Sequence, residues 1–375
     1  MECDNPSRKE WTMHTIVVGG GLVGLTTAAA LQHIGHTVTV LEQAPEIRAV
    51  GAGIGLWDNA LRELDELGIG TRVRALGQGI ETWFFDPAGH PLRAPGRDAS
   101  DHSFLLVPRP ELNALLADHV GRDRITVGAK VTGYTEDAGG VVVRLAEGDP
   151  LRADLLVGAD GVHSRIRAGL LPGSEAQVHQ GHYAWRAIVP AAGRPEGTVL
   201  TVGPGRTRGG YARVAADRTM WMVNQFDAGP LTGGKRDRAL QRAHRLADAG
   251  WHEDLLRMIA DTPEDAILEN RIMRVPALPH WTSDRVALIG DAAHGLSPHI
   301  AAGGTLGIED VGVLRAALSA SPDPAAALPA YERARIPRFD RIREFSESVE
   351  NTADAAEFAE TYAAFSHWML TTAPQ

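Results

Sequence analysis

The first part of the chain alternates short apolar runs with a helical pattern. His14 to Val18 is an apolar, β-branched run typical of a buried strand, and the glycines from Gly19 to Gly21 interrupt it. The Ala- and Leu-rich stretch from Leu22 predicts a helix that ends at Gly35, a residue suited to a left-handed cap. Val38 to Leu41 predicts a second buried strand. The pattern therefore predicts a βαβ unit.

Further helices and buried strands follow along the chain. Helices are predicted at 59–67, where leucines recur every three residues, and at 110–120, where proline takes the first helical position. Buried strands are predicted at 155–159 and 285–289, and each brings an acidic residue beside a glycine to its C-terminal end. Another helix is predicted over 304–318. These elements extend the first unit into an α/β domain.

Two stretches have a different pattern. Over 80–106 and 178–226, short runs rich in Trp, Tyr, Phe and Val alternate with Gly and Pro turns, as in antiparallel strands. We expect them to form a sheet that is inserted in the α/β domain and contacts the substrate. The sequence SPDP at 321–324 then breaks the chain before polar C-terminal helices.

Composition and charge narrow the possible chemistry. The 375 residues are 44% apolar and 22% charged, which is ordinary for a globular protein. Lys plus Arg number 37 and Asp plus Glu 47, and the net charge of -10 disfavours a general nucleic-acid binder. Cys3 is the single cysteine, so intramolecular disulfides, thiolate zinc sites and iron–sulfur clusters are excluded, and we expect no metal. Redox chemistry would need a bound organic cofactor.

The same patterns bear on location. The start of the chain has no apolar signal-like region, so a cytoplasmic protein is expected. Residues 15–41 carry no charge and are long enough to cross a bilayer, but glycines and polar residues interrupt them. We therefore expect strand, turn and helix there, and no membrane span.

A glycine motif lies between the first strand and the first helix. Gly19, Gly21 and Gly24 form GxGxxG, in which the glycines allow a tight turn, the approach of a pyrophosphate and close helix–strand contact. Glu42 ends the second strand, 23 residues after Gly19, where it can accept hydrogen bonds from an adenosine ribose. A purely structural turn is the alternative. Because the motif occurs once, tightly held FAD is favoured over two separate nucleotide domains.

Two further motifs follow buried strands. In DLLVGADGVHSRIR, a strand ends at Asp160, and the Ser164 hydroxyl, the Arg167 guanidinium and backbone N–H groups then converge near a helix start. Such donors would suit a pyrophosphate, although an N-capped helix with surface arginines fits equally well. In RVALIGDAAHGLSPH, Asp291 lies just past a strand and could bind a ribityl or ribose hydroxyl. A plain turn at the strand end is the alternative for this motif.

In this order and at these distances, GGGLVG with Glu42, ADGVHSRIR, and RVALIGDAAH with Pro298 resemble the FAD-dependent aromatic hydroxylase family. These are the group A flavoprotein monooxygenases, and the short salicylate-hydroxylase-like branch is the most similar. The resemblance covers roughly Met13 to Arg343. It implies an α/β fold: a GxGxxG-type, Rossmann-like FAD-binding domain with an inserted antiparallel substrate sheet and C-terminal helices. We expect the FAD-binding domain at 12–75, 100–172 and 281–322, the substrate sheet at 76–99 and 173–280, and the helices at 323–375.

The resemblance also implies the chemistry and the cofactor-binding residues. NADH or NADPH would reduce non-covalent FAD, and O2 would form a flavin C4a-hydroperoxide that hydroxylates a small aromatic or heteroaromatic substrate. Arg109 would touch the flavin cofactor, Asp291 its ribityl or ribose part, and Asp160 with Gly161 both FAD and the nicotinamide. The expected cofactor-binding residues are Gly19, Gly21, Leu22, Val23, Gly24, Glu42, Gly53, Arg109, Val131, Asp160, Asp291, Pro298, Gly303 and Gly304.

The chain departs from the family at one motif. Where relatives carry PxxGQG, it reads PHIAAGGT from Pro298 to Thr305. A helix N-terminus there could still stabilise negative charge on a reduced flavin ring. His299 could act as a general base or orient a phenolate, and a turn histidine bonded to the backbone is the alternative.

Substrate contacts are expected from the inserted sheet. Arg186 and Tyr211 join His299 as catalytic candidates, with Trp185 beside them, and Arg213, Trp221 and Asn224 are substrate candidates. Each could instead be a packing or surface residue. Arg186 or Arg213 could pair with a substrate carboxylate.

Other functions use parts of the same pattern. Baeyer–Villiger insertion, epoxidation or N-hydroxylation would use the same flavin chemistry. A nicotinamide-dependent dehydrogenase without flavin would share GxGxxG but leaves the Asp160 and Asp291 motifs unexplained. A flavin-binding interaction protein would keep the cofactor motifs and lose the pocket. We expect a monomer or homodimer acting on a small aromatic molecule and O2.

Overall fold

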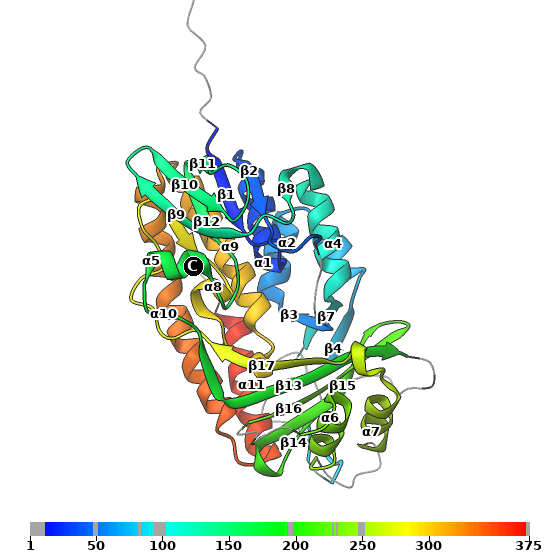
Figure 1. Ribbon diagram of the computed structural model, residues 1–375. Helices are drawn as coiled ribbons and strands as arrows, with labels where there is room; N and C mark the ends of the chain where they lie inside the picture. The colour runs from blue at the N-terminus through cyan, green and yellow to red at the C-terminus, as the bar shows by residue number, and fades with distance from the viewer. Residues whose placement is uncertain are drawn as a thin grey trace, which may run out of the picture.

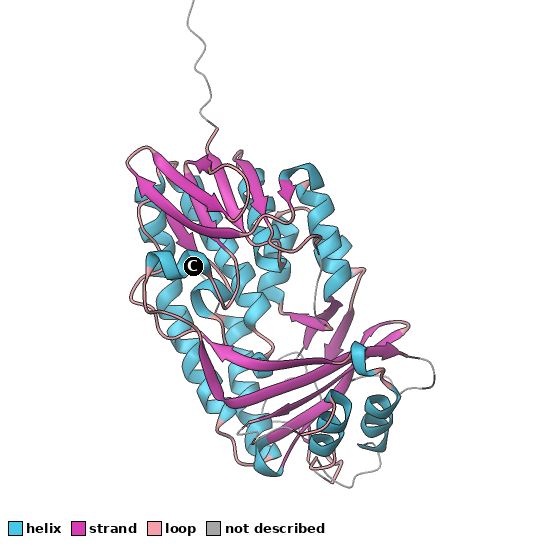
Figure 2. Cartoon of the chain, in the orientation of Figure 1, coloured by secondary structure: helices cyan, strands magenta, loops and turns pink. Residues whose placement is uncertain are grey.

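The computed structural model describes residues 12–47, 52–81, 84–86, 88–92, 103–191, 193, 198–226, 229, 232–246 and 252–372. Cys3 and the start of the chain lie outside the described residues, as does much of the 76–99 segment assigned to the substrate sheet. The two largest sheets are of different kinds and lie one at each end of the view in Figure 2.

The first sheet is parallel and carries the glycine motif. Its strands lie in the order β18-β12-β1-β2-β8, which is the pattern of a Rossmann-like domain. The strands are β1 (His14–Val18), β2 (Thr37–Leu41), β8 (Ile125–Thr126), β12 (Leu155–Gly158) and β18 (Val286–Leu288). Most of their side chains are apolar because helices or a second sheet cover both faces.

Helices and a small antiparallel sheet cover the parallel sheet. The helix after the glycine motif packs against two others, which are distant in sequence. These helices are α1 (Leu22–His33), α4 (Arg109–Val120) and α9 (Gly303–Ala320). The small sheet contacts β1 and β12, and its strands are β9 (Val131–Asp137), β10 (Gly140–Leu145) and β11 (Leu151–Ala153). Two short helices, α5 (Arg165–Leu170) and α8 (Asp291–His294), follow β12 and β18.

The second large sheet is antiparallel except for one parallel pair, β14 with β5. In order across the sheet, its strands are β17 (Leu268–Arg274), β13 (Gln177–Pro190), β16 (Arg218–Gln225), β15 (Thr207–Ala215), β14 (Thr198–Gly203), β5 (Phe84–Phe85) and β6 (Pro91–Leu92). Helices α6 (Lys235–Ala243) and α7 (His252–Asp261) bury one face. The other face is free to meet the first domain.

One sequence expectation is corrected here. The stretch 80–106 was expected to lie in the large antiparallel sheet, but only β5 and β6 do so among its described residues. The rest forms a separate three-stranded sheet of β3 (Gly53–Leu56), β7 (Ser103–Pro108) and β4 (Gln78–Glu81). Ile80 and Leu106 of this sheet pack on Val214 and Met220, so it joins the two domains. Helices α2 (Asp58–Glu66) and α3 (Gly70–Arg74) follow β3.

The C-terminal helices connect the two domains. Figure 1 shows α10 (Pro324–Glu350) running along the side of the molecule from the parallel to the antiparallel sheet, with α11 (Ala355–Thr371) beside it. The Tyr331 hydroxyl on α10 donates to the Leu288 carbonyl at the end of β18. No described helix is long and apolar enough to cross a membrane. The structure confirms the predicted fold class.

Candidate active site

A cavity of about 950 Å³ lies between the two domains. Its walls come from segments far apart in the chain: the glycine loop, the turn after β18, the start of α9, the uncovered face of the antiparallel sheet, and α11. Of the residues expected to bind a cofactor, the cavity is lined by Gly19, Gly21, Leu22, Val23, Glu42, Gly53, Arg109, Val131, Asp160, Asp291, Pro298, Gly303 and Gly304. The structure therefore brings the three sequence motifs together at one place.

The glycine loop has the geometry that its spacing predicts. Gly19 has a φ of +112°, and a Cβ there would lie 2.3 Å from the Ala159 carbonyl oxygen. A Cβ on Gly24 would lie 1.9 Å from the Gly19 carbonyl oxygen, so Gly24 serves helix–strand contact and does not line the cavity. At Gly21 a Cβ would meet no atom within 4 Å. The loop is thus tightly packed on the protein side and open on the cavity side.

Glu42 holds this loop from the end of β2. Its carboxylate accepts hydrogen bonds from the backbone N–H groups of Gly20 at 2.6 Å and Ala44 at 2.7 Å. The side chain also lines the cavity. Because a carboxylate has about four acceptor positions, Glu42 can shape the loop and still accept a ribose hydroxyl.

The Asp160 motif is mainly a helix cap. Ser164 caps α5 by accepting from the Arg167 N–H, and Asp160 accepts from the Ser164 hydroxyl and the Arg165 N–H. Burial raises the pKa of Asp160, although these hydrogen bonds oppose the rise. The Arg167 guanidinium is buried and donates to the carbonyls of Ser174, Ala292 and Val162. The helix is therefore capped as in the alternative, but Arg167 is buried and is not a surface arginine, and Asp160, Ser164 and Arg167 all line the cavity.

Asp291 and the start of α9 form another wall. No described residue donates a hydrogen bond to the Asp291 carboxylate, which is exposed in the cavity close to Gly303. Helix α9 starts at Gly303 without a side-chain cap and without an acidic residue in its first turn. Gly304 packs against Leu22, so the N-termini of α9 and α1 lie side by side. Two helix N-termini with free N–H groups thus meet at the cavity.

The departure from PxxGQG places alanine in a conformation that favours glycine. Ala301 has a φ of +52° and a ψ of 27°, in the left-handed region. Its carbonyl accepts from the Trp57 indole N–H, which holds the turn in place. The turn therefore has a left-handed residue at this position although the residue is alanine, and Ala301 is strained.

His299 is among the residues that line the cavity, and its side chain belongs to a buried polar cluster. Its Nδ1 lies 2.8 Å from the Ser297 hydroxyl and 3.3 Å from Glu350 Oε1, and its Nε2 donates to the Ser346 carbonyl. Burial, with the charge of Arg208, lowers the pKa of His299 well below its usual value. Both ring nitrogens have hydrogen-bond partners, and one partner is a backbone carbonyl. This geometry agrees with the alternative of a turn histidine bonded to the backbone. The Ser297 hydroxyl also contacts His182 Nδ1 at 3.1 Å.

The substrate candidates divide between the two faces of the antiparallel sheet. Arg186 and Asn224 line the cavity, and Arg186 donates to the side-chain Oδ1 of Asn270. Tyr211 and Trp221 lie on the opposite face in the core under α6 and α7, where the Trp221 indole donates to Thr262. Burial there raises the pKa of Tyr211 to about 12.

Of the two other candidates, Arg213 lies away from the cavity, whereas Trp185 lines it. Arg213 is not among the lining residues and donates to the Ala216 carbonyl. The ring of Trp185 belongs to the same core as Trp221, and its indole donates to Glu269. The structure therefore does not bring Tyr211, Arg213 or Trp221 to the site.

Sequence reasoning missed Arg208. This residue lines the cavity, its side chain is 2% exposed, and its Nε and Nη1 have no hydrogen-bond partner among the described residues. Its Nη2 donates to the Val349 and Glu350 carbonyls. The alternation along β15 could have indicated that Arg208 and Tyr211 face opposite sides, but not which side meets the cavity.

Aromatic residues from the last helix were also missed. Phe358 and Tyr362 of α11 line the cavity, and both pack against Phe84 of β5. The Arg208 guanidinium lies 4.7 Å from the Phe358 ring centroid. The C-terminal helices are therefore part of the site as well as part of the framework.

The geometry can be compared with known proteins. The sequence model of a family described as FAD binding domain matches residues 12–346. The chain belongs to this FAD-binding family. An aurachin C monooxygenase/isomerase of Stigmatella aurantiaca is 34% identical, covering 86% of this chain and 85% of the relative. An FAD-dependent urate hydroxylase of Klebsiella pneumoniae is 32% identical, covering 88% and 87%. A 6-hydroxynicotinate 3-monooxygenase of Bordetella bronchiseptica is 30% identical, covering 88% and 89%.

Solved structures agree with the sequence relatives. Klebsiella pneumoniae HpxO complexed with FAD and uric acid superposes with a TM-score of 0.79 at 27% identity, over 94% of this chain and 92% of HpxO. P. aeruginosa PqsL in complex with 2-aminobenzoylacetate superposes with a TM-score of 0.77 at 25% identity, over 94% and 99%. The flavoprotein is an FAD-dependent monooxygenase that uses NAD(P)H and O2, which confirms the expectation from the sequence. A dehydrogenase without flavin is set aside.

The cavity of this monooxygenase fits FAD on its own evidence. Gly21 is open to the cavity, α1 and α9 start without side-chain caps, and the Asp291 carboxylate has no donor among the described residues. These are groups that a pyrophosphate, a flavin ring and a ribityl hydroxyl would satisfy.

The strain at Ala301 leads to a first prediction. A left-handed alanine costs about 1 kcal/mol or more, whereas glycine pays roughly 0.5–1 kcal/mol of extra backbone entropy on folding. We therefore expect Ala301→Gly to leave the free energy of unfolding unchanged or to raise it by up to about 1 kcal/mol. Ala302→Gly is the matched control, because Ala302 has an unstrained φ of -105° and is fully buried, so the loss of its methyl group should cost about 1 kcal/mol. Urea unfolding measures both, and equal losses would contradict the strain.

The buried histidines lead to a second prediction. Burial, with nearby positive groups, lowers the pKa of His182 to about 3. Between pH 6.5 and about 3 the unfolded chain then binds more protons at this position than the folded chain, so stability falls as the pH drops below 6.5, by about 1.4 kcal/mol per unit. His182→Asn should reduce this slope by about that amount, measured as the free energy of unfolding at pH 7.5, 6.5 and 5.5. An unchanged slope would mean that His182 is not held neutral in the folded protein.

Proposed function

We propose that the cavity residues hold FAD and that the enzyme hydroxylates a small aromatic or heteroaromatic substrate bearing an anionic group, which Arg208 binds. Arg208 carries this proposal. Burial lowers its pKa to about 10, and Glu350 opposes the shift, so the guanidinium is charged at neutral pH. A buried charge with unpaired N–H groups is unfavourable unless an anion compensates it. A carboxylate, enolate or phenolate oxygen at Nε and Nη1 would do so.

The rest of the cavity suits the ring of such a substrate. Phe358, Tyr362, Met220 and Met222 line it, and they offer flat and adaptable apolar surfaces. The names of several relatives contain anions of this kind: urate, 6-hydroxynicotinate and 3-hydroxybenzoate. These names support the substrate class for the present chain and do not identify its member.

Each part of the site has a role in this proposal. The glycine loop and the start of α1 bind the FAD pyrophosphate, Glu42 and Asp291 accept from its hydroxyl groups, and the start of α9 faces the flavin ring. FAD, when bound, supplies the oxidation of NAD(P)H and the activation of O2 for transfer of one oxygen atom. Arg208 orients the substrate, and the α11 aromatic residues exclude water.

Cytoplasmic location and a monomeric or homodimeric state belong to the same proposal, and light scattering on the purified enzyme tests the oligomeric state.

Asp291 tests the FAD site. Asp291→Ala removes an acceptor that has no donor among the described residues, so we expect purified protein depleted in the yellow cofactor and with its fold intact. Absorbance at the flavin band relative to the protein band measures occupancy, and circular dichroism checks the fold. Asp291→Asn, which keeps an acceptor oxygen, should lose less. Full flavin occupancy in the alanine variant would overturn the assignment.

Arg208 tests the substrate class. Aromatic carboxylates and phenols are screened for faster NAD(P)H oxidation and for products heavier by one oxygen atom, each beside its neutral amide or methyl ether. We expect the anionic members to be active, and Arg208→Gln to raise their KM roughly 30-fold, for a loss of about 2 kcal/mol. Arg186→Gln is the control, since Arg186 lines the same cavity but is bonded to Asn270. Neutral compounds that work equally well, or equal losses in both variants, would refute the role of Arg208.

A further inference from the structure

The turn that precedes Asp291 packs against α1 and is anchored from α9. Gly290 has a φ of +59°, and a Cβ on it would lie 3.1 Å from the methyl groups of Val23 on α1. The turn therefore lies against the helix that carries the glycine motif. Its position determines where the Asp291 carboxylate meets the cavity.

Asp310 is the side chain that anchors this turn. It lies on α9 and is fully buried. Its Oδ2 accepts from the Gly290 N–H at 2.9 Å and from His294 Nε2 at 2.6 Å, and its Oδ1 accepts from Arg335 Nε at 2.6 Å. One carboxylate thus receives hydrogen bonds from both ends of the turn segment 290–294 and from α10.

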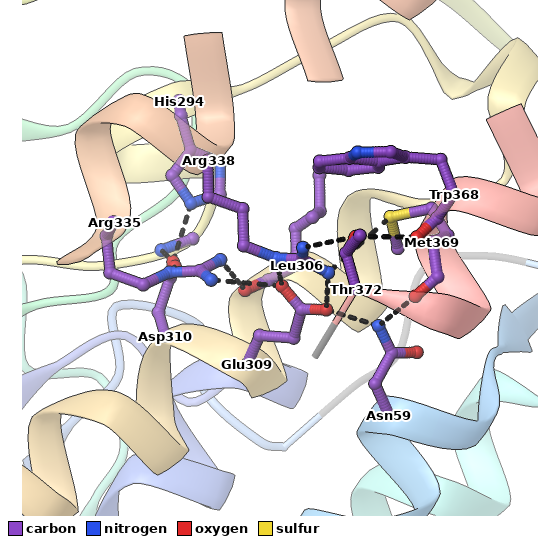
Figure 3. A network of polar contacts seen from close by, with 11 residues as sticks. Asn59, His294, Leu306, Glu309, Asp310, Arg335, Arg338, Trp368, Met369 and Thr372 are labelled. Carbon is purple, nitrogen blue, oxygen red and sulfur yellow. Dashed lines mark hydrogen bonds and ion pairs between the residues drawn. The ribbon is translucent and has the colours of Figure 1, made fainter. Parts of the chain in front are cut away.

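His294 has little freedom to move away from Asp310. Its ring stacks on Phe339 of α10, with centroids 4.6 Å apart, and lies 5.0 Å from the Trp281 ring centroid. Figure 3 shows His294, Asp310 and Arg335 converging at one end of a buried polar network. The turn is therefore held to α9 by charged hydrogen bonds in a setting without solvent.

Glu309, the acidic residue before Asp310, has a different role in the same network. Glu309 accepts from Arg335 and Arg338, and from Asn59 of α2, so it joins α9 to α10 and α2. Glu309 and Asp310 are both buried, adjacent in sequence, and paired with arginine. Of these two acids, Asp310 is the one that accepts a hydrogen bond from the turn before Asp291.

We propose that Asp310 is a positioning residue for FAD: it fixes the Gly290–Asp291 turn relative to the N-terminus of α9, so that both present their groups to the same cofactor. This inference rests on the proposed role of Asp291. Glu309 stabilises the helix packing without setting the affinity for FAD. Loss of Asp310 should therefore weaken FAD binding beyond what loss of folding stability explains.

The experiment compares Asp310→Asn with Glu309→Gln. An amide has one acceptor oxygen, so it cannot serve both Arg335 on one side and Gly290 with His294 on the other. Flavin is removed from each variant, thermal melting of the apoprotein reports stability, and titration with FAD followed by quenching of flavin fluorescence reports the Kd. We expect similar decreases in the melting temperature, but a rise in the FAD Kd of roughly tenfold or more for Asp310→Asn only, as for other residues that orient binding groups.

A second variant covers the case in which Asp310→Asn does not fold. His294→Phe keeps a ring between Trp281 and Phe339 and removes one N–H donor to Asp310, and it should raise the FAD Kd while leaving the Asp310–Arg335 pair in place. An unchanged Kd in the folded variants, or equal changes for Asp310→Asn and Glu309→Gln, overturns the proposal. If Asp291→Ala keeps its flavin, the proposed FAD site itself fails. If Asp291→Ala loses flavin and Asp310→Asn does not, only the positioning role fails.

Discussion

The meeting of two uncapped helix N-termini is the constraint on which the rest of this structure depends. Helices α1 and α9 both start without a side-chain cap, and Gly304 packs against Leu22 so that the two starts are adjacent. In a closed core, the positive ends of the two helix dipoles would repel each other, and the free N–H groups would lack acceptors. They are tolerable because a cavity lies in front of them, where an electron-rich dinucleotide can bind.

Buried charge holds this unfavourable arrangement in place. Figure 3 shows Glu309 and Asp310 of α9 paired with Arg335 and Arg338 of α10, all with side chains almost completely buried. Burial alone would raise the pKa of Asp310, but His294 and Arg335 outweigh it and the net pKa is lowered. Such pairs add less to stability than a count of contacts indicates, because desolvation opposes them. These ion pairs fix the position of α9 relative to α10, because each acid accepts hydrogen bonds from defined arginines.

The antiparallel sheet also contains a buried charge that is held by hydrogen bonds, the guanidinium of Arg208. Arg208 is anchored by backbone carbonyls at the end of α10 and lies between aromatic rings, with part of its guanidinium left unpaired beside the cavity. Near it, His182 and His299 are kept neutral by burial. The side of the cavity proposed to bind the substrate thus carries the positive charge of Arg208. Among the described residues, no acidic side chain accepts a hydrogen bond from Nε or Nη1 of Arg208. That asymmetry distinguishes it from the side proposed to bind FAD, where the carboxylates of Glu42 and Asp291 line the cavity.

Much of the FAD side could be predicted because its signals are local. Gly19 and Gly21 are adjacent to the turn that they permit, and Asp291 follows its strand directly. The substrate side could not be predicted in the same way. Tyr211 and Trp221 have the right chemistry on the right strands, but alternation along a strand does not say which face α6 and α7 will cover.

By itself, the sequence determined the backbone of the cofactor loop, the α/β fold and the family, because glycine spacing, strand runs and caps act within a few residues. Tertiary structure alone decided that Arg208 lies buried at the cavity, that Phe358 and Tyr362 reach it from the last helix, and that Asp310 binds Gly290. These contacts join residues that are 20 to more than 140 positions apart. Their partners are chosen by how whole elements pack, and no pattern within a single element records that choice.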